Sequence, residues 1–353
     1  MPDWTKPMQQ SYEFYTVDAK TWKDIKPLNC VKSCTINRDS EAETLGSATF
    51  QLTETITESY IRVYLITIQN GVKERHPLGT FLAQTPSSDF DGNVLNASVD
   101  AYTPLIELKE KQPPIGYFVK INKDTLTQAG QLSADYARAP VVSVSNDTSK
   151  TEGNFVADTD DTWLSFINDL LTNEKYKFDL DEMGRILFKP DQELKTLQHV
   201  WTYTDDNSSI LQPELTINQD IYGIPNVVEV IYSTGTTTYY SRVTNEDKNS
   251  IISIPNRGRE IVHRVTDPSL VGASSQEEVD DYARQVLSEL STIEATASYT
   301  HGYCPVRLGD CVRLDYTRAK MRNIKAKVIS QSIECKPGCS VKEKAVFITK
   351  LWR

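Results

Sequence analysis

Short runs in which apolar and polar residues alternate, each ending in a turn signal, constrain the fold of this chain more than any other feature. In SATFQLT, Ala48, Phe50 and Leu52 alternate with polar residues, as expected for a strand with one buried face. The run IRVYLITIQNGVKERHPLG reads as two strands joined by a tight turn at Asn70-Gly71. Frequent Tyr, Thr and Val favour strands as well. The chain is therefore expected to be mainly β.

Changes in composition divide the chain into parts. A further tight turn is expected at Asp91-Gly92, whereas Pro113 and Pro114 cannot both lie inside a sheet. β patterns resume after Pro213, with a hairpin that turns near Gly235. We therefore expect an α+β, mainly β chain with an arm at 1–30, a first antiparallel β domain at 31–108, an inserted small α+β domain at 109–212 and a second antiparallel β domain at 213–353.

The inserted domain is expected to contain one helix and one hairpin. Apolar residues from Trp163 to Leu171 recur every three or four positions, which indicates a helix. Asp160, Asp161 and Thr162 precede it; a calcium loop is conceivable, but an N-cap with acidic residues at the positive helix end explains them better. A hairpin is expected to turn near Gly184, and residues 129–160 are expected to form loops.

A second helix is expected in SSQEEVDDYARQVLSEL. Its start carries a capping box, formed by Ser274 with Glu277 or by Ser275 with Glu278. One apolar stripe is expected to pack against a sheet; it consists of Val279, Tyr282, Ala283, Val286, Leu287 and Leu290.

Charge and motif content exclude several functional classes. The net charge is −10, whereas nucleic-acid binding normally needs a basic face. The start of the chain does not resemble a signal peptide, and no apolar run could span a bilayer. We therefore expect synthesis in a reducing cytoplasm. The sequence contains no G-x-S-x-G, H-E-x-x-H, P-loop or G-x-G-x-x-G motif, and it is not expected to be an enzyme. The densest group of basic residues is expected to lie on an exposed loop and on the polar face of a strand. Its members are Arg318, Lys320, Arg322, Lys325 and Lys327.

Four of the six cysteines border two turns near the carboxyl end. In a four-strand antiparallel meander, the turns PVRLGD and KPG would bring all four sulfurs to one end of the sheet. Four thiols in a reducing compartment would suit a structural zinc ion or an iron–sulfur cluster, with His301 as a possible substitute ligand. The spacing C-x6-C…C-x3-C is not that of a zinc ribbon, so free packed thiols and disulfides formed outside the cell stay open. The candidate metal ligands are Cys304, Cys311, Cys335 and Cys339, whereas Cys30 and Cys34 are expected to be ordinary buried thiols.

Several segments, taken in order, resemble one family. They are DAYTPLIELKE, DTWLSFINDLLTNEKYKFDLDEMGRILFKP, IPNVVEVIYS, SRVTNEDKNSIIS, RGREIVHRVTDPSL, YTHGYCPVRLGDCVRLDY and KVISQSIECKPGCSVKEKAVF. The chain from about Val31 onward resembles the central tail-hub or baseplate-hub proteins of tailed phages and related contractile injection systems.

The resemblance implies that the β domains at 31–108 and 213–353 are tail-tube-like antiparallel β-barrels with α+β structure between them. The early part of the second is a candidate to complete the first barrel. It also implies a homotrimeric ring that adapts a hexameric tail tube, or a distal tail protein, to a trimeric spike or tip, with a possible contact to the tape-measure protein. DNA would pass the lumen without specific binding, and the protein would belong to the virion after assembly in the host cytoplasm. Trp4 and Trp22 would be near a neighbouring tail protein. The alternatives are a distal-tail adaptor or a carbohydrate-binding module at the host surface, and, less favoured, a cell-wall hydrolase.

Overall fold

The computed structural model describes residues 2–90, 92, 95–142, 150–206, 209–266, 273 and 275–352. The chain forms two compact units. The first comprises Met1–Leu215, Tyr299–Asn323 and Lys327–Lys344, and the second comprises Thr216–Ser298, Ile324–Ala326 and Ala345–Arg353. Strands outnumber helices in both units, and most strand pairs are antiparallel. The expected α+β, mainly β fold class is confirmed.

The largest sheet among the described residues has 13 strands. Its order is β13-β17-β20-β19-β3-β4-β7-β6-β5-β1-β2, and β18 pairs with both β19 and β12 beside this path. These strands are β1 (Gln9–Val17), β2 (Asp24–Pro27), β3 (Val31–Asp39), β4 (Gly46–Leu52), β5 (Ser59–Gln69), β6 (Val72–Phe90), β7 (Leu95–Tyr102), β12 (His199–Thr204), β13 (Leu211–Gln219), β17 (Thr292–Gly302), β18 (Cys311–Tyr316), β19 (Met321–Glu334) and β20 (Ser340–Lys350).

The alternating patterns near the amino end form the strands expected from them. Ala48, Phe50 and Leu52 on β4 are buried in the core. β5 and β6 pair up to Gln69↔Val72, and the two turn residues Asn70 and Gly71 have φ of 52° and 79°. Positive φ at both positions is the geometry of a type I′ turn, as the Asn-Gly pair predicts. The turn expected at Asp91-Gly92 includes Asp91, which lies outside the described residues.

The sequence pattern predicted a separate arm at residues 1–30, but these residues contribute strands to the large sheet. β1 pairs with β5 from Gln9↔Ile68 to Val17↔Tyr60, and β2 pairs with β1. Trp22 is buried, with its ring 4.8 Å from the ring of Tyr60, so Trp22 is a core residue of this chain. The prediction was wrong because the run QQSYEFYTV has few aliphatic residues, although its aromatic residues Tyr12 and Phe14 alternate with polar ones as in a strand.

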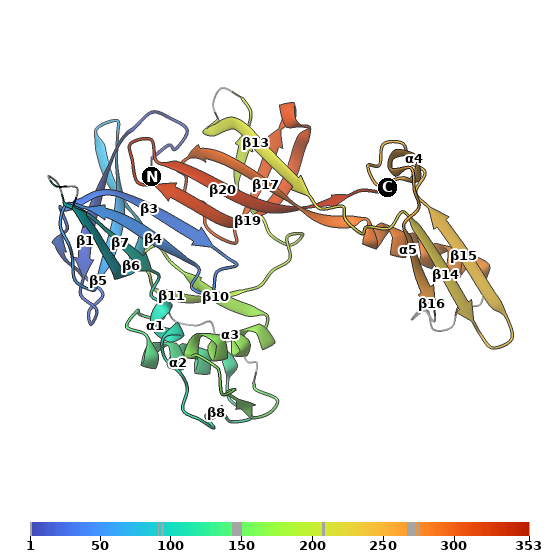
Figure 1. Cartoon of the computed structure of the whole chain (residues 1–353), viewed down its shortest axis with the longest axis horizontal. Helices are drawn as coiled ribbons and strands as arrows, with labels where there is room; N and C mark the ends of the chain where they lie inside the picture. The colour runs from blue at the N-terminus through green and yellow to red at the C-terminus, as the bar shows by residue number, and fades with distance from the viewer. Residues whose placement is uncertain are drawn as a thin grey trace. The chain divides into compact units, whose positions relative to one another are not determined.

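The inserted α+β segment packs as helices against one another beside a short hairpin (Figure 1). Helix α3 (Trp163–Asn173) begins at Thr162, whose hydroxyl accepts a hydrogen bond from the Ser165 N–H at 3.1 Å. Ser165 Oγ accepts one from the Thr162 N–H at 2.9 Å, which completes a capping box. β10 (Tyr176–Leu180) and β11 (Ile186–Pro190) form the hairpin expected near Gly184. The N-cap and the hairpin are therefore confirmed.

The longest helix that the sequence analysis missed lies in this segment. α2 (Thr125–Tyr136) occupies part of the stretch expected to be loops, and the Asp124 carboxylate caps it by accepting from the Thr127 N–H at 2.7 Å. Its buried face is made largely of small residues, such as Ala129 and Ser133, so its apolar periodicity is weak. The remaining elements of the segment are α1 (Ile106–Lys109), β8 (Phe118–Val119) and β9 (Phe155–Val156).

The last four strands are present as expected, but they do not form a meander. β17 pairs with β13 and β20, whereas β18 pairs with β19 and runs parallel to β12. The segment between β17 and β18 is therefore a crossover and not a hairpin turn. The short helix η1 (Thr317–Ala319) joins β18 to β19.

The second unit contains a three-stranded sheet covered by one helix. β14 (Val227–Ser233) pairs with β15 (Thr238–Thr244), which confirms the hairpin near Gly235, and with β16 (Val262–Thr266) in parallel. Helix α5 (Gln276–Leu290) begins at Ser275, whose Oγ accepts from the Glu278 N–H at 3.3 Å; the alternative cap, Ser274, lies outside the described residues. The stripe packs against the sheet as expected, with Val279, Ala283 and Leu287 on Val228 and Val230. A short helix, α4 (Ile254–Arg257), precedes β16.

Candidate functional site

The four carboxyl-terminal cysteines do not converge, so the predicted convergence is wrong. Gly309 and Asp310, just before Cys311, exchange backbone hydrogen bonds with Val328 on β19. Cys335, which directly follows β19, lies seven positions after Val328. At about 3.3 Å per residue, Cys311 and Cys335 are offset along the strands by at least roughly 23 Å. The prediction failed because it made β17 and β18 a hairpin and gave β18 the length of β19.

The cysteines as placed do not fit a tetrahedral metal site, whose metal–sulfur bonds are about 2.3 Å. All six cysteines are buried thiols, and the described residues contain no group of three or more His, Cys, Asp or Glu side chains that could hold a metal ion. Zinc or iron binding stays a prediction that elemental analysis of the purified protein tests. Cys304 lies beside Tyr203 and His301, whereas Cys335 lies beside Cys34.

A buried polar cluster surrounds Glu343 in the first unit. The Glu343 carboxylate accepts hydrogen bonds from the Tyr299 hydroxyl at 2.6 Å and from Gln331 Nε2 at 2.6 Å. His301 Nε2 lies 3.4 Å from Glu343 Oε2 and 3.1 Å from the Tyr203 hydroxyl, which also contacts the Cys304 sulfur at 3.3 Å. The cluster comes from β12, β17, β19, β20 and the crossover, and its members are Tyr203, Tyr299, His301, Cys304, Gln331 and Glu343.

The contacts of His301 inside this cluster keep its imidazole protonated. Burial alone would lower the pKa of His301, but the contacts with the Cys304 thiol and the Glu343 carboxylate outweigh it and raise that pKa to about 10. Burial raises the pKa of Tyr299 and of Tyr203 well above the usual value, and the nearby Glu343 charge adds to it. Histidine is therefore the cation, and the two phenols stay neutral donors.

The cluster is closed to substrates. Its six side chains are at most 2% exposed, so no solute can reach His301 or Cys304 without opening the sheet. Sequence reasoning noted His301 and Cys304 but missed Glu343. The signal was available: Val341, Glu343, Ala345 and Phe347 occupy alternate positions of one strand, which places a carboxylate on the inward face.

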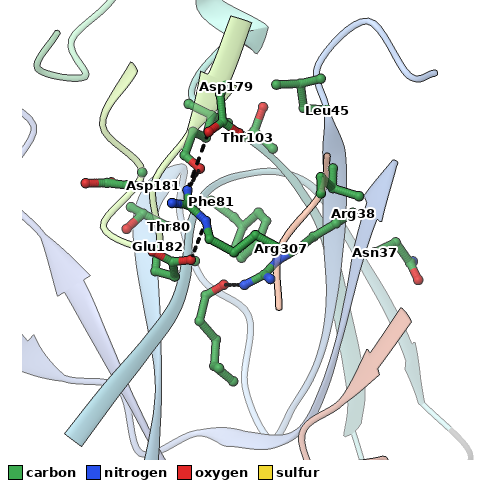
Figure 2. A pocket seen from close by; sticks show the side chains of 15 residues that line it. Asn37, Arg38, Leu45, Thr80, Phe81, Thr103, Asp179, Asp181, Glu182 and Arg307 are labelled. Atoms are coloured by element: carbon green, nitrogen blue, oxygen red, sulfur yellow. Dashed lines mark hydrogen bonds and ion pairs between the residues drawn. The ribbon is translucent and has the colours of Figure 1, made fainter. Parts of the chain in front are cut away.

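A second polar site lies where the β10–β11 turn meets β3 and β6 (Figure 2). Figure 2 shows Arg307 between Asp179 and Glu182; Arg307 Nε lies 2.7 Å from Glu182 Oε1, and Nη2 lies 3.7 Å from Asp179 Oδ2. Arg307 also donates to the Leu180 carbonyl at 2.5 Å. On the opposite wall, Arg38 donates to the Leu78 carbonyl at 2.7 Å. Both arginines of this pocket already bond to protein groups, Arg307 to carboxylates and Arg38 to a carbonyl. The pocket therefore connects the β10–β11 hairpin to the sheet and offers no unpaired arginine to a ligand.

No helix in the described residues is both long enough and apolar enough to cross a membrane. Comparison of the sequence with family models and with curated proteins gives no match.

Solved structures, by contrast, share the fold along nearly the whole chain. A tail protein from Neisseria meningitidis MC58 matches with a TM-score of 0.60 at 12% identity, over 96% of each chain. The 43 kDa tail protein of prophage MuSo2 from Shewanella oneidensis matches with a TM-score of 0.59 at 12% identity, over 95% of this chain and 98% of the other. A chain of the Francisella PdpA–VgrG complex matches at 0.53 and 10% identity, over 97% of this chain and 58% of the other. The chain has the fold of phage tail proteins, as its resemblance to the tail-hub family implied.

Proposed function

We propose that this protein is a structural hub of a phage tail tip or baseplate. Three copies form a ring that adapts the hexameric tail tube, or a distal tail protein, to a trimeric spike or tip and surrounds the DNA channel. The observation that carries this proposal is the fold match to two tail proteins over at least 95% of both partners' chains. A match of that extent leaves no large part of this chain for a separate task.

A non-enzymatic role is part of the proposal. The histidine and carboxylate that lie together, His301 and Glu343, are enclosed in the core, and Arg307 in the second polar site is paired with Asp179 and Glu182. The matched structures from Neisseria and Shewanella are named as tail proteins. Both considerations favour a role in assembly over a cell-wall hydrolase.

The distal-tail or carbohydrate-binding alternative has less support. A carbohydrate-binding surface needs several aromatic side chains side by side. Among the described residues the large exposed aromatics lie on separate elements or turns; they are Phe90, Phe118, Tyr222 and Tyr240.

The test is the mass of the assembly. The purified protein is measured by light scattering after size exclusion, alone and with the candidate tube and spike proteins. We expect three copies per particle at least when a partner is present. A protein that stays a single subunit with every such partner would falsify the proposal, and a stable complex with another stoichiometry would reject the ring of three.

A further inference from the structure

Two thiols that are far apart in the sequence face each other across adjacent strands. The register of β3 and β19 runs from Ser330↔Asp39 to Glu334↔Thr35, so the next pair along is Cys335 and Cys34. The Cys335 N–H donates to the Cys34 carbonyl at 2.9 Å, which continues that pairing. This bond makes Cys34 and Cys335 a hydrogen-bonded pair, whose Cα atoms lie about 5.5 Å apart, inside the range of about 4.4–6.8 Å that a disulfide spans.

Both side chains point into the same core. Cys34 is 3% exposed, Cys335 is 6% exposed, and both belong to the hydrophobic cluster of β3, β4 and β7. Contact with the Cys34 thiol, together with burial, raises the pKa of Cys335 well above its usual value, which places the two sulfurs against each other.

A third thiol is close but is turned toward another partner. Cys339 directly precedes β20, and its sulfur contacts the Tyr12 hydroxyl. Burial raises the pKa of Tyr12, and the contact with Cys339 adds to that rise. The same hydroxyl donates to the Lys336 carbonyl at 2.8 Å. Cys34 therefore is the strand neighbour of Cys335, and Cys339 serves as the internal comparison.

We propose that Cys34 and Cys335 form an intramolecular disulfide when the protein meets an oxidised low-molecular-weight disulfide, such as glutathione disulfide. The Cys335 thiolate attacks one glutathione sulfur, forms a mixed disulfide and releases one glutathione thiolate. The Cys34 thiolate then attacks the Cys335 sulfur and releases the second glutathione. Two protein thiols are oxidised, one glutathione disulfide is reduced, and the two protons go to the two glutathione thiolates.

The turn after β19 gives the oxidant a route. Lys336, Pro337 and Gly338 are exposed, and Gly338 has φ of 96°. Local opening of this turn uncovers Cys335 without unfolding the sheet. Because the thiolate is the attacking species, the reaction is expected to be slow near pH 7 and more than about tenfold faster near pH 9.

The experiment detects the large loop that the disulfide would close, through the gel mobility of the denatured chain. The full-length protein is purified with a reductant, which is then removed, incubated with glutathione disulfide at pH 8.5, blocked with N-ethylmaleimide and denatured. A Cys34–Cys335 bond closes a loop of 335 − 34 = 301 positions, so the oxidised chain is expected to migrate faster on a non-reducing gel and to lose that shift with dithiothreitol. Peptide mass spectrometry identifies the linked pair.

Matched alanine variants assign the bond. Cys34→Ala and Cys335→Ala are expected to lose the mobility shift, whereas Cys339→Ala and Cys304→Ala keep it. Should a variant not fold, the peptide map of the wild-type protein decides alone. Six free thiols after prolonged oxidation, a Cys335–Cys339 link, or glutathione left attached to Cys335 would each overturn the proposal. None of these outcomes bears on the mass of the assembly, so the two proposals fail separately.

Discussion

Glu343 connects three buried polar side chains in the first unit. Its carboxylate accepts from Tyr299 and Gln331 and faces His301. Glu343→Gln keeps the shape but removes the charge, and breaking a buried pair costs about 3–5 kcal/mol. We expect a loss of that size in the free energy of unfolding, measured with urea at pH 7. Glu334→Gln, an exposed carboxylate on β19, is the matched control and should change stability by less than about 0.5 kcal/mol.

The same cluster predicts a pH dependence. The pKa of His301 is raised to about 10, from about 6.5 in an unfolded chain. A histidine with a raised pKa contributes stability that is complete below about pH 6.5 and is lost as the pH rises toward 10. Urea unfolding of the wild type should therefore give a free energy that falls between pH 6.5 and 10. A fall of equal size in Glu343→Gln would show that other groups cause it.

At the scale of elements, the amino-terminal strands are expected to be essential. β1 covers the β5 edge along nine residue pairs, and Arg62 on β5 donates to Asp24 at 2.8 Å and to the Thr80 hydroxyl at 2.8 Å. Deletion of residues 1–30 removes β1 and Asp24, so the buried Arg62 keeps Thr80 but loses its carboxylate partner. We expect an insoluble protein, or loss of the cooperative transition in circular dichroism. Deletion of residues 2–8, which ends before β1, is the control and should retain that transition.

The β5–β6 turn gives a smaller effect that isolates backbone conformation. A Cβ at Gly71 would meet nothing within 4 Å, but φ there is +79°. Gly71→Ala should therefore cost about 1–2 kcal/mol through the left-handed backbone alone. Gly153→Ala, also in open space but without positive φ, should be neutral or slightly stabilising. Equal effects of the two substitutions on the urea midpoint would contradict this reasoning.

Most helices, strands and turns that were predicted correctly have local sequence patterns. The pairing of strands that are far apart in the sequence could not be predicted from such patterns. The β4 alternation, the Asn70-Gly71 turn and the caps of α3 and α5 depend on neighbours within a few residues, so the sequence contains the full signal. The prediction for the Cys304–Cys311 segment was wrong because β18 pairs with β12, which lies more than 100 residues earlier in the chain. Nothing within PVRLGD distinguishes a hairpin turn from a crossover, and the candidate metal site depended on that difference.

For the whole molecule, the net charge of −10 predicts weak contact with DNA. Affinity for duplex DNA comes mainly from neutralised phosphates, and the proposed channel has to pass DNA without retaining it. We expect no shift of a 30-base-pair duplex on a native gel at 150 mM salt and micromolar protein. Binding in that range, with a steep salt dependence, would show a basic surface and argue against free passage.

The pairing of β3 with β19 has a consequence for synthesis on the ribosome. β3 is complete once residue 39 has been made, but the strand that covers its open side ends at Glu334. For most of translation β3 is an uncovered edge, and such edges recruit other chains. A nascent chain stalled before residue 321 would thus be the species that aggregates, and chaperones would be needed most during that interval.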